Sequence, residues 1–122
     1  MELRNPLSKY QLDVLRPRPL VVDFDWSDVS GGNLLMGICP AGHLIDKTVI
    51  DVSVPFDGSL QITVGDSVAQ GRLQAASDNV PDEVGRYEAR NDYEYALDTE
   101  IFLFFPSGIP TIGSGRAIVY FD

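Results

Sequence analysis

Period-two alternation of apolar residues is the feature of this sequence that most constrains its fold. Between Ile50 and Phe56 every second residue is apolar, and Leu60–Val64 repeats the pattern after the dipeptide Asp57-Gly58. Such alternation predicts half-buried antiparallel strands. An Asp-Gly turn between two alternating runs predicts a β-hairpin, so we expect these two strands to pair with each other.

Short runs of strand-forming residues recur along the rest of the chain, and clusters of Gly, Pro, Asn and Asp separate them. About nine short strands at this spacing predict an all-β protein, either an antiparallel β-sandwich, a jelly roll or a small barrel. The further strands expected are Leu20–Trp26, Leu34–Ile38, Val68–Gln74, Gly85–Ala89, Tyr93–Leu97, Glu100–Phe105 and Arg116–Phe121.

The first 18 residues differ in charge from the rest of the chain. The chain has 122 residues, enough for one domain, and its formal net charge is −9, of which residues 1–18 contribute +2 and the remainder −11. We expect an N-terminal arm at 1–18, helical from Asn5 or extended, on a β-domain at 19–122. The arm either docks on an acidic neighbour or is a poorly ordered terminus. Its basic residues, which are interface candidates, are Arg4, Lys9, Arg16 and Arg18.

Composition restricts the partners and the compartment. The acidic surface argues against nucleic acid as a direct partner, because phosphates repel it. Cys39 is the only cysteine, so no intramolecular disulfide is possible and a cytosolic origin is favoured over a secreted one. No apolar run approaches the ~18 residues that span a membrane, and no signal peptide is recognised at the N-terminus. We expect a soluble protein made in the cytoplasm, without a membrane partner.

The stretch Gly108–Gly115 has a spacing of glycines close to that of a phosphate-binding loop. Ser114 stands where such a loop needs its lysine. Pro110 lacks the backbone N–H that would donate a hydrogen bond to a phosphate oxygen. The β-rich run Arg116–Phe121 follows, so no helix N-terminus is expected there to hold an anion. The stretch therefore predicts a turn between two strands and no nucleotide cofactor.

Two other patterns resemble catalytic or metal sites without completing them. Gly65-Asp66-Ser67 is similar to the nucleophile block of an esterase family, but the only histidine, His43, lies upstream without the required aspartate before it. We expect a turn in which Asp66 binds its own backbone. One histidine and one cysteine are too few for a zinc site, so we predict no catalytic residue and no cofactor.

The run Asp23–Asp28 is similar to the start of a calcium loop. The sixth and twelfth positions, however, are Asp28 and Leu34 in place of glycine and glutamate. Alternation explains the run better, because it places Phe24 and Trp26 inward and the aspartates in solvent. We expect no metal beyond an adventitious surface cation.

Two strands are apolar on both faces. Ile101–Phe105 and Ala117–Phe121 lack the polar alternate positions that the outer face of a sandwich strand normally carries. Either another part of the chain covers these outer faces or they meet another subunit. The interface candidates on these strands are Phe102, Phe104, Val119 and Phe121.

The order of these turns and strands resembles that of small virion proteins of tailed bacteriophages, above all the β-sandwich head decoration (cement) proteins. The resemblance covers residues 20–122. The stretches that carry it are Pro40–Ile45, Val52–Gly58, Leu60–Asp66, Gly85–Tyr87, Tyr95–Ile101 and Pro110–Tyr120.

The resemblance implies a jelly-roll-like structural module without catalysis or cofactor. It implies that the chain binds the outer surface of a phage head, between subunits of the major capsid protein, as a homo-oligomer (trimer or dimer) located in the virion. A tail or baseplate β-module is an alternative. A third possibility is a carbohydrate-binding β-sandwich, in which the stacking face would be formed by Trp26, Tyr87, Tyr93 and Tyr95.

Overall fold

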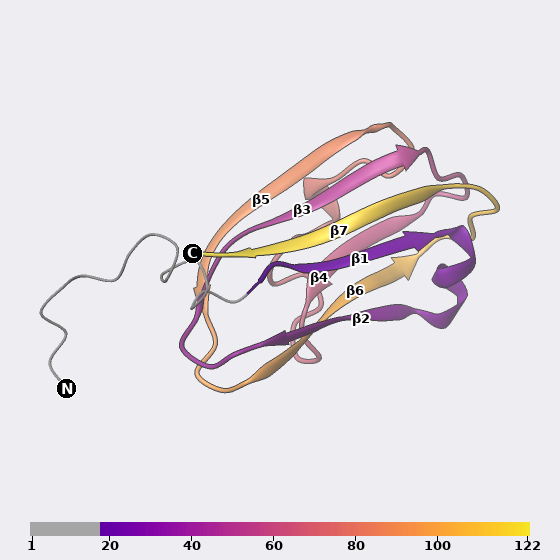
Figure 1. Ribbon diagram of the computed structural model, residues 1–122. Helices are drawn as coiled ribbons and strands as arrows, with labels where there is room; N and C mark the ends of the chain where they lie inside the picture. The colour runs from indigo at the N-terminus through magenta and orange to yellow at the C-terminus, as the bar shows by residue number, and fades with distance from the viewer. Residues whose placement is uncertain (1–17) are drawn as a thin grey trace, which may run out of the picture.

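Two antiparallel sheets pack face to face in the computed structural model, which describes residues 18–122 (Figure 1). The all-β sandwich expected from the sequence is confirmed, whereas the proposed helix near Asn5 lies outside the described residues. The strands are β1 (Leu20–Asp25), β2 (Asn33–Cys39), β3 (Leu44–Val54), β4 (Gln61–Gly65), β5 (Gly85–Glu94), β6 (Thr99–Ser107) and β7 (Ser114–Phe121). Two short 3-10 helices, η1 (Trp26–Gly31) and η2 (Ala76–Asp78), lie in the connections.

Consecutive strands alternate between the two sheets. The four-stranded sheet has the order β1-β7-β3-β5 and the three-stranded sheet the order β2-β6-β4. Odd-numbered strands therefore form one sheet and even-numbered strands the other, so that each connection carries the chain across the sandwich. This is the arrangement of a jelly roll with one of its eight strands missing.

The predicted hairpin through Asp57-Gly58 is wrong. β3 pairs with β5 and β7, whereas β4 pairs with β6 in the opposite sheet. The connection instead binds the β6–β7 loop: the Asp57 carboxylate accepts hydrogen bonds from Thr111 and from the Ile112 backbone N–H, and the Ile109 N–H donates to the Gly58 carbonyl. The connection through Asp57-Gly58 does reverse the chain as predicted, but it joins β3 and β4, which lie in different sheets, and not two neighbouring strands.

The predicted strand Val68–Gln74 is also wrong, since this segment makes only an isolated bridge between Gln74 and Val64 of β4. It occupies the place of the missing eighth strand, beside the edge of β4. A buried polar network fixes it there: Thr48 Oγ1 donates to the Leu73 carbonyl at 2.9 Å, and Asn79 Nδ2 donates to Gln74 Oε1 at 2.9 Å. Side-chain hydrogen bonds thus replace part of a backbone ladder.

The two predicted strands Gly85–Ala89 and Tyr93–Leu97 form one strand, β5, which ends at Glu94. The turn signal between them, Asn91-Asp92, is a bulge opposite β3, in which Asp92 takes a φ of +50°. Every exposed position of β5 is charged. Because β5 is an edge strand, these charges oppose pairing with a strand of another chain.

The core lies between the inner faces of the two sheets. Ile50 and Ala117 of the four-stranded sheet are fully buried, as are Ile101 and Leu103 of β6. At one end Phe24 and Phe56 stack, with ring centroids 5.6 Å apart. Alternation along each strand supplies this core, as the sequence predicts.

Asp66 is a buried carboxylate at the start of the segment that replaces the eighth strand. Its oxygens accept hydrogen bonds from the backbone N–H groups of Val68 and Ala69, from Arg72 Nε at 2.7 Å and from the Tyr95 hydroxyl at 2.7 Å. The self-binding turn expected at Asp66 is therefore confirmed. Burial opposes ionisation of this carboxyl group, but the hydrogen bonds outweigh it and lower the pKa of Asp66.

Replacing Tyr95 by Phe removes one hydrogen bond to a buried charge. We expect the Tyr95→Phe variant to lose about 2 kcal/mol of unfolding free energy at pH 7, measured by urea denaturation. The matched control is Tyr120→Phe, because the Tyr120 hydroxyl contacts Arg86 at the surface, at 3.4 Å. A loss of the same size in both variants would contradict the role given to Asp66.

The pH dependence of stability provides a second test of Asp66. The folded-state pKa of this carboxyl is lowered, so its stabilisation is present above the unfolded-state pKa and is lost as the pH falls through the folded-state pKa. In Tyr95→Phe the folded-state pKa should rise toward the unfolded-state value. We therefore expect a smaller acid-induced loss of unfolding free energy in this variant than in the wild type.

Candidate interaction surface

The outer face of the four-stranded sheet is polar apart from the row of Val21, Ile118 and Val49, and four ion pairs lie on it. Ion pairs connect neighbouring strands across this sheet, so opposite charges neutralise one another locally. The pairs are Lys47–Glu88 at 2.8 Å, Arg86–Asp51 at 3.1 Å, Arg90–Asp46 at 3.1 Å and Arg116–Asp23 at 2.6 Å. The hydrogen bond from Arg116 lowers the pKa of Asp23. This face is suited to contact with water.

The apolar residues of β7 are accounted for within the domain. Ile118 lies on the outer face opposite Val49, and the neighbouring rows in register carry charged side chains on either side of this pair. Val119 is fully buried in the core, so it is not available to a partner. Phe121 is half-buried and packs against the core. Of the two strands expected to be apolar on both faces, β7 therefore offers no open interface.

The outer face of the three-stranded sheet is largely apolar, with Glu100 opposite Ile38 and Thr63 opposite Phe104 as its polar members. Phe102 and Phe104 of β6 lie there with ring centroids 5.6 Å apart, and Leu35 of β2 stands opposite Phe102. Leu35 is 50% exposed and Ile38 is 56% exposed, whereas Phe102 is half-buried and Phe104 is buried. Within residues 18–122 no ion pair connects the strands of this sheet. We call Leu35, Ile38, Phe102 and Phe104 the apolar face.

Phe102 and Phe104 could be found from the sequence, but Leu35 and Ile38 could not. Under strict alternation these two residues, three positions apart, would point to opposite sides of the sheet. A bulge between Leu35 and Gly37 adds one residue to β2, and both side chains then face outward. The run Leu34–Ile38 is apolar apart from Gly37, so no pattern marks the bulge.

A second apolar surface lies at the end of the sandwich where β1, β3 and β6 finish. Trp26, Ile109 and Ile112 are 47%, 85% and 55% exposed, and we call this end of the domain the tip. A surface pocket of about 400 Å³ opens there. Its lining residues are Trp26, Ser27, Val29, Ser30, Gly108, Ile109 and Pro110.

Trp26 does not face inward as the alternation predicts. Asp25 caps η1: its carboxylate accepts hydrogen bonds from the Ser27 hydroxyl and from the Ser27 N–H at 2.8 Å, and these lower the pKa of Asp25. Asp28 in turn accepts a hydrogen bond from the Asp25 N–H at 2.9 Å. This capping box ends β1 one residue early and turns the Trp26 side chain outward. The Asp23–Asp28 run is thus explained by a cap and an ion pair, and residues 18–122 contain no cluster of potential metal ligands.

The β6–β7 loop holds Ile109 and Ile112 in place. It leads directly into β7 at Ser114, which confirms the predicted turn between strands. Gly113 has a φ of +129°, and a Cβ atom there would lie 2.2 Å from the Phe56 ring. Asp57, the residue after Phe56, binds the same loop through its carboxylate, so the exposed apolar side chains of the tip stand on a loop that two neighbouring residues hold.

The remaining candidates are distributed differently from the expectation. Tyr87 and Tyr93 pack against the core and Tyr95 is buried in it, so these side chains do not form a stacking face with Trp26. Arg18 is exposed before β1. The other basic residues of the arm, Arg4, Lys9 and Arg16, lie outside the described residues.

Comparison with known proteins supports the fold. No family model and no curated protein sequence matches the chain. Among solved structures it is similar to a chain of the capsid asymmetric unit of cyanophage Pam1, with a TM-score of 0.67 and 13% sequence identity over 85% of this chain and 82% of that one. In residues 18–122 no helix has the length and hydrophobicity needed to cross a membrane.

The support of the tip can be tested at Gly113. We expect Gly113→Ala to lower the unfolding free energy by about 1–3 kcal/mol, because the new Cβ meets Phe56 and the φ is unfavourable for alanine. The matched control is Gly31→Ala, where a Cβ meets nothing within 4 Å. Chemical denaturation followed by Trp26 fluorescence measures both variants, and equal stability of the two would show that the loop is not held as described.

Proposed function

We propose that this protein is a non-enzymatic structural component of a phage virion and that it decorates the outer surface of the head as a cement protein. The likeness to a chain of a cyanophage capsid supports the virion role. The two chains are of similar length, since the alignment covers more than four-fifths of each. A single small β-sandwich of this kind is suited to binding on a shell that other subunits build.

The contrast between the two outer faces carries the proposal. The ion-paired face of the four-stranded sheet is suited to solvent, whereas the apolar face exposes Leu35 and Ile38. Both side chains are already about half covered, so a partner that covers the rest of one of them gains about half of the 1.5–3 kcal/mol of a full burial. An apolar area on an otherwise charged domain marks a contact with another protein. We assign this face to the outer surface of the major capsid protein.

A symmetric homo-oligomer fits this mode of attachment. In a dimer or trimer, two or three apolar faces would meet the capsid together. Once one face is bound, the others are held at a high effective concentration near the capsid, so the overall affinity exceeds that of a single face. The net charge of −9 keeps the exposed surface acidic and favours a partner surface with basic residues around its apolar centre.

The proposal is tested by mixing purified protein with heads that lack it. Wild-type protein should co-sediment with the heads, and Leu35→Asp should lower binding by at least about tenfold, since a carboxylate would be buried unpaired. The matched control is Val21→Asp, because Val21 is also 50% exposed on an edge strand but belongs to the other sheet. An equal loss of binding in both variants would contradict the assignment of the face.

Location in the virion is a separate outcome of the same preparation. Antibody labelling of intact particles in electron micrographs should mark the head surface. Labelling of tails alone would replace the decoration role by that of a tail or baseplate module.

A further inference from the structure

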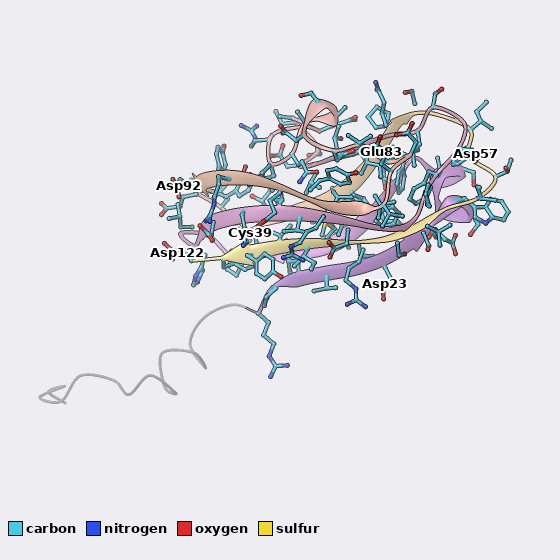
Figure 2. All side chains as sticks on the ribbon, turned by 90° about the horizontal axis from the view of Figure 1, so that it is seen from above. Asp23, Cys39, Asp57, Glu83, Asp92 and Asp122 are labelled. Atoms are coloured by element: carbon cyan, nitrogen blue, oxygen red, sulfur yellow. The ribbon has the colours of Figure 1, made fainter. Side chains whose placement is uncertain are left out.

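The tip combines apolar surface with acidic charge. Four segments, made of connections and the strand ends beside them, meet at this end of the sandwich: 25–32, 55–60, 79–84 and 106–113. None of them contains a lysine or arginine. Their acidic residues are Asp25, Asp28, Asp57, Asp82 and Glu83. None of them lines the tip pocket itself, and Figure 2 shows Asp57 at this end of the domain. A ligand for this end should therefore be positively charged as well as apolar.

The pocket at the tip is already shaped before any ligand binds. Trp26 is placed by the cap of η1, and Ile109 by the hydrogen bond of its N–H to the Gly58 carbonyl. Because these side chains stand on fixed backbone, binding requires little ordering of the pocket itself. An exposed indole beside a pocket of about 400 Å³ is suited to apolar side chains of a peptide.

The chain itself contains a segment with this combination. Residues 1–17, outside the described part, carry the basic residues Arg4, Lys9 and Arg16 and the acidic residues Glu2 and Asp13, a formal net charge of +1. Between them stand Leu7, Tyr10 and Val14, at spacings of three and four residues. The segment thus offers apolar side chains and positive charge to a surface that has apolar side chains and negative charge.

Geometry favours the tip of a neighbouring copy over the chain's own tip. β1 runs from Leu20 toward η1, so residues 1–17 join the domain at the end opposite the tip (Figure 1). Pro19 has a fixed φ and disfavours a helical conformation at Arg18, which opposes a reversal of the chain just before β1. Seventeen residues reach roughly 55–60 Å when extended. The 11-residue strand β3 measures only about 36 Å, so the segment is long enough to reach either tip, and the choice of the neighbouring copy rests on the direction in which the chain leaves β1.

We propose that residues 1–17 of one copy bind the tip pocket of another copy and so connect copies of this chain. This contact does not involve the apolar face, and the proposal does not depend on what that face binds. Its failure would leave the decoration role intact, and failure of head binding would leave this contact intact.

Trp26 provides a direct measurement, because it is the only tryptophan of the chain. In the full-length protein its fluorescence emission should shift to shorter wavelength as concentration rises, in step with the increase in mass seen by sedimentation. A synthetic peptide of residues 1–18, added in excess, should compete for the pocket and return the mass to that of a monomer while Trp26 stays protected.

Charge reversal in the arm and substitution at the tip should have the same effect. The full-length triple variant Arg4→Glu, Lys9→Glu, Arg16→Glu should associate at least about tenfold more weakly, as should Ile109→Asp. The matched control for the tip is Val68→Asp: Val68 is 87% exposed and Ile109 is 85% exposed, but Val68 follows β4 at the other end of the domain. Association of the control should equal that of the wild type.

Three results would overturn the proposal. The first is an emission that does not change with concentration while the mass rises, since association would then not involve the tip. The second is protection of Trp26 in a protein that stays monomeric, since the arm would then bind its own domain. The third is unchanged association of Ile109→Asp.

Discussion

The packing of Phe56 is the contact on which the rest of the structure depends. Its side chain is buried, stacks on Phe24 and fills the space that a side chain at position 113 would need. Residues from the β1, β3–β4 and β6–β7 parts of the chain thereby meet in one place. The β3–β4 and β6–β7 connections each pass from one sheet to the other. Their contact at Phe56 therefore fixes how the sheets stack and how the tip is presented.

The alternation of the sequence was sufficient to predict strands and a sandwich, but not which strands are neighbours. Asp57-Gly58 is a good turn in either case, since turn chemistry describes the local backbone and carries no information on the sheet that the chain enters next. The same limit applies to Val68–Gln74, whose residues suit a strand. In the structure the side chain of Gln74 forms hydrogen bonds with the side chains of Thr48 and Asn79 in the interior.

The interaction surfaces were predictable only in part, and single-residue irregularities explain the difference. Phe102 and Phe104 follow from a strand that is apolar on both faces. Leu35 and Ile38 share a face only because of a bulge in β2, and Trp26 is exposed only because Asp25 caps a 3-10 helix. Each irregularity shifts the alternation by one residue, which is enough to move a side chain from the core to the surface.

The segment that replaces the eighth strand has a consequence for behaviour at high concentration. It lies along the edge of β4. On the same side of the sandwich, the charged side chains of β5 disfavour strand pairing at the edge of the other sheet. Strand-by-strand growth into fibres is thereby blocked along this whole flank. On this flank, copies of the chain can then meet through side chains and not through exposed backbone, whereas the opposite flank ends in the edge strands β1 and β2.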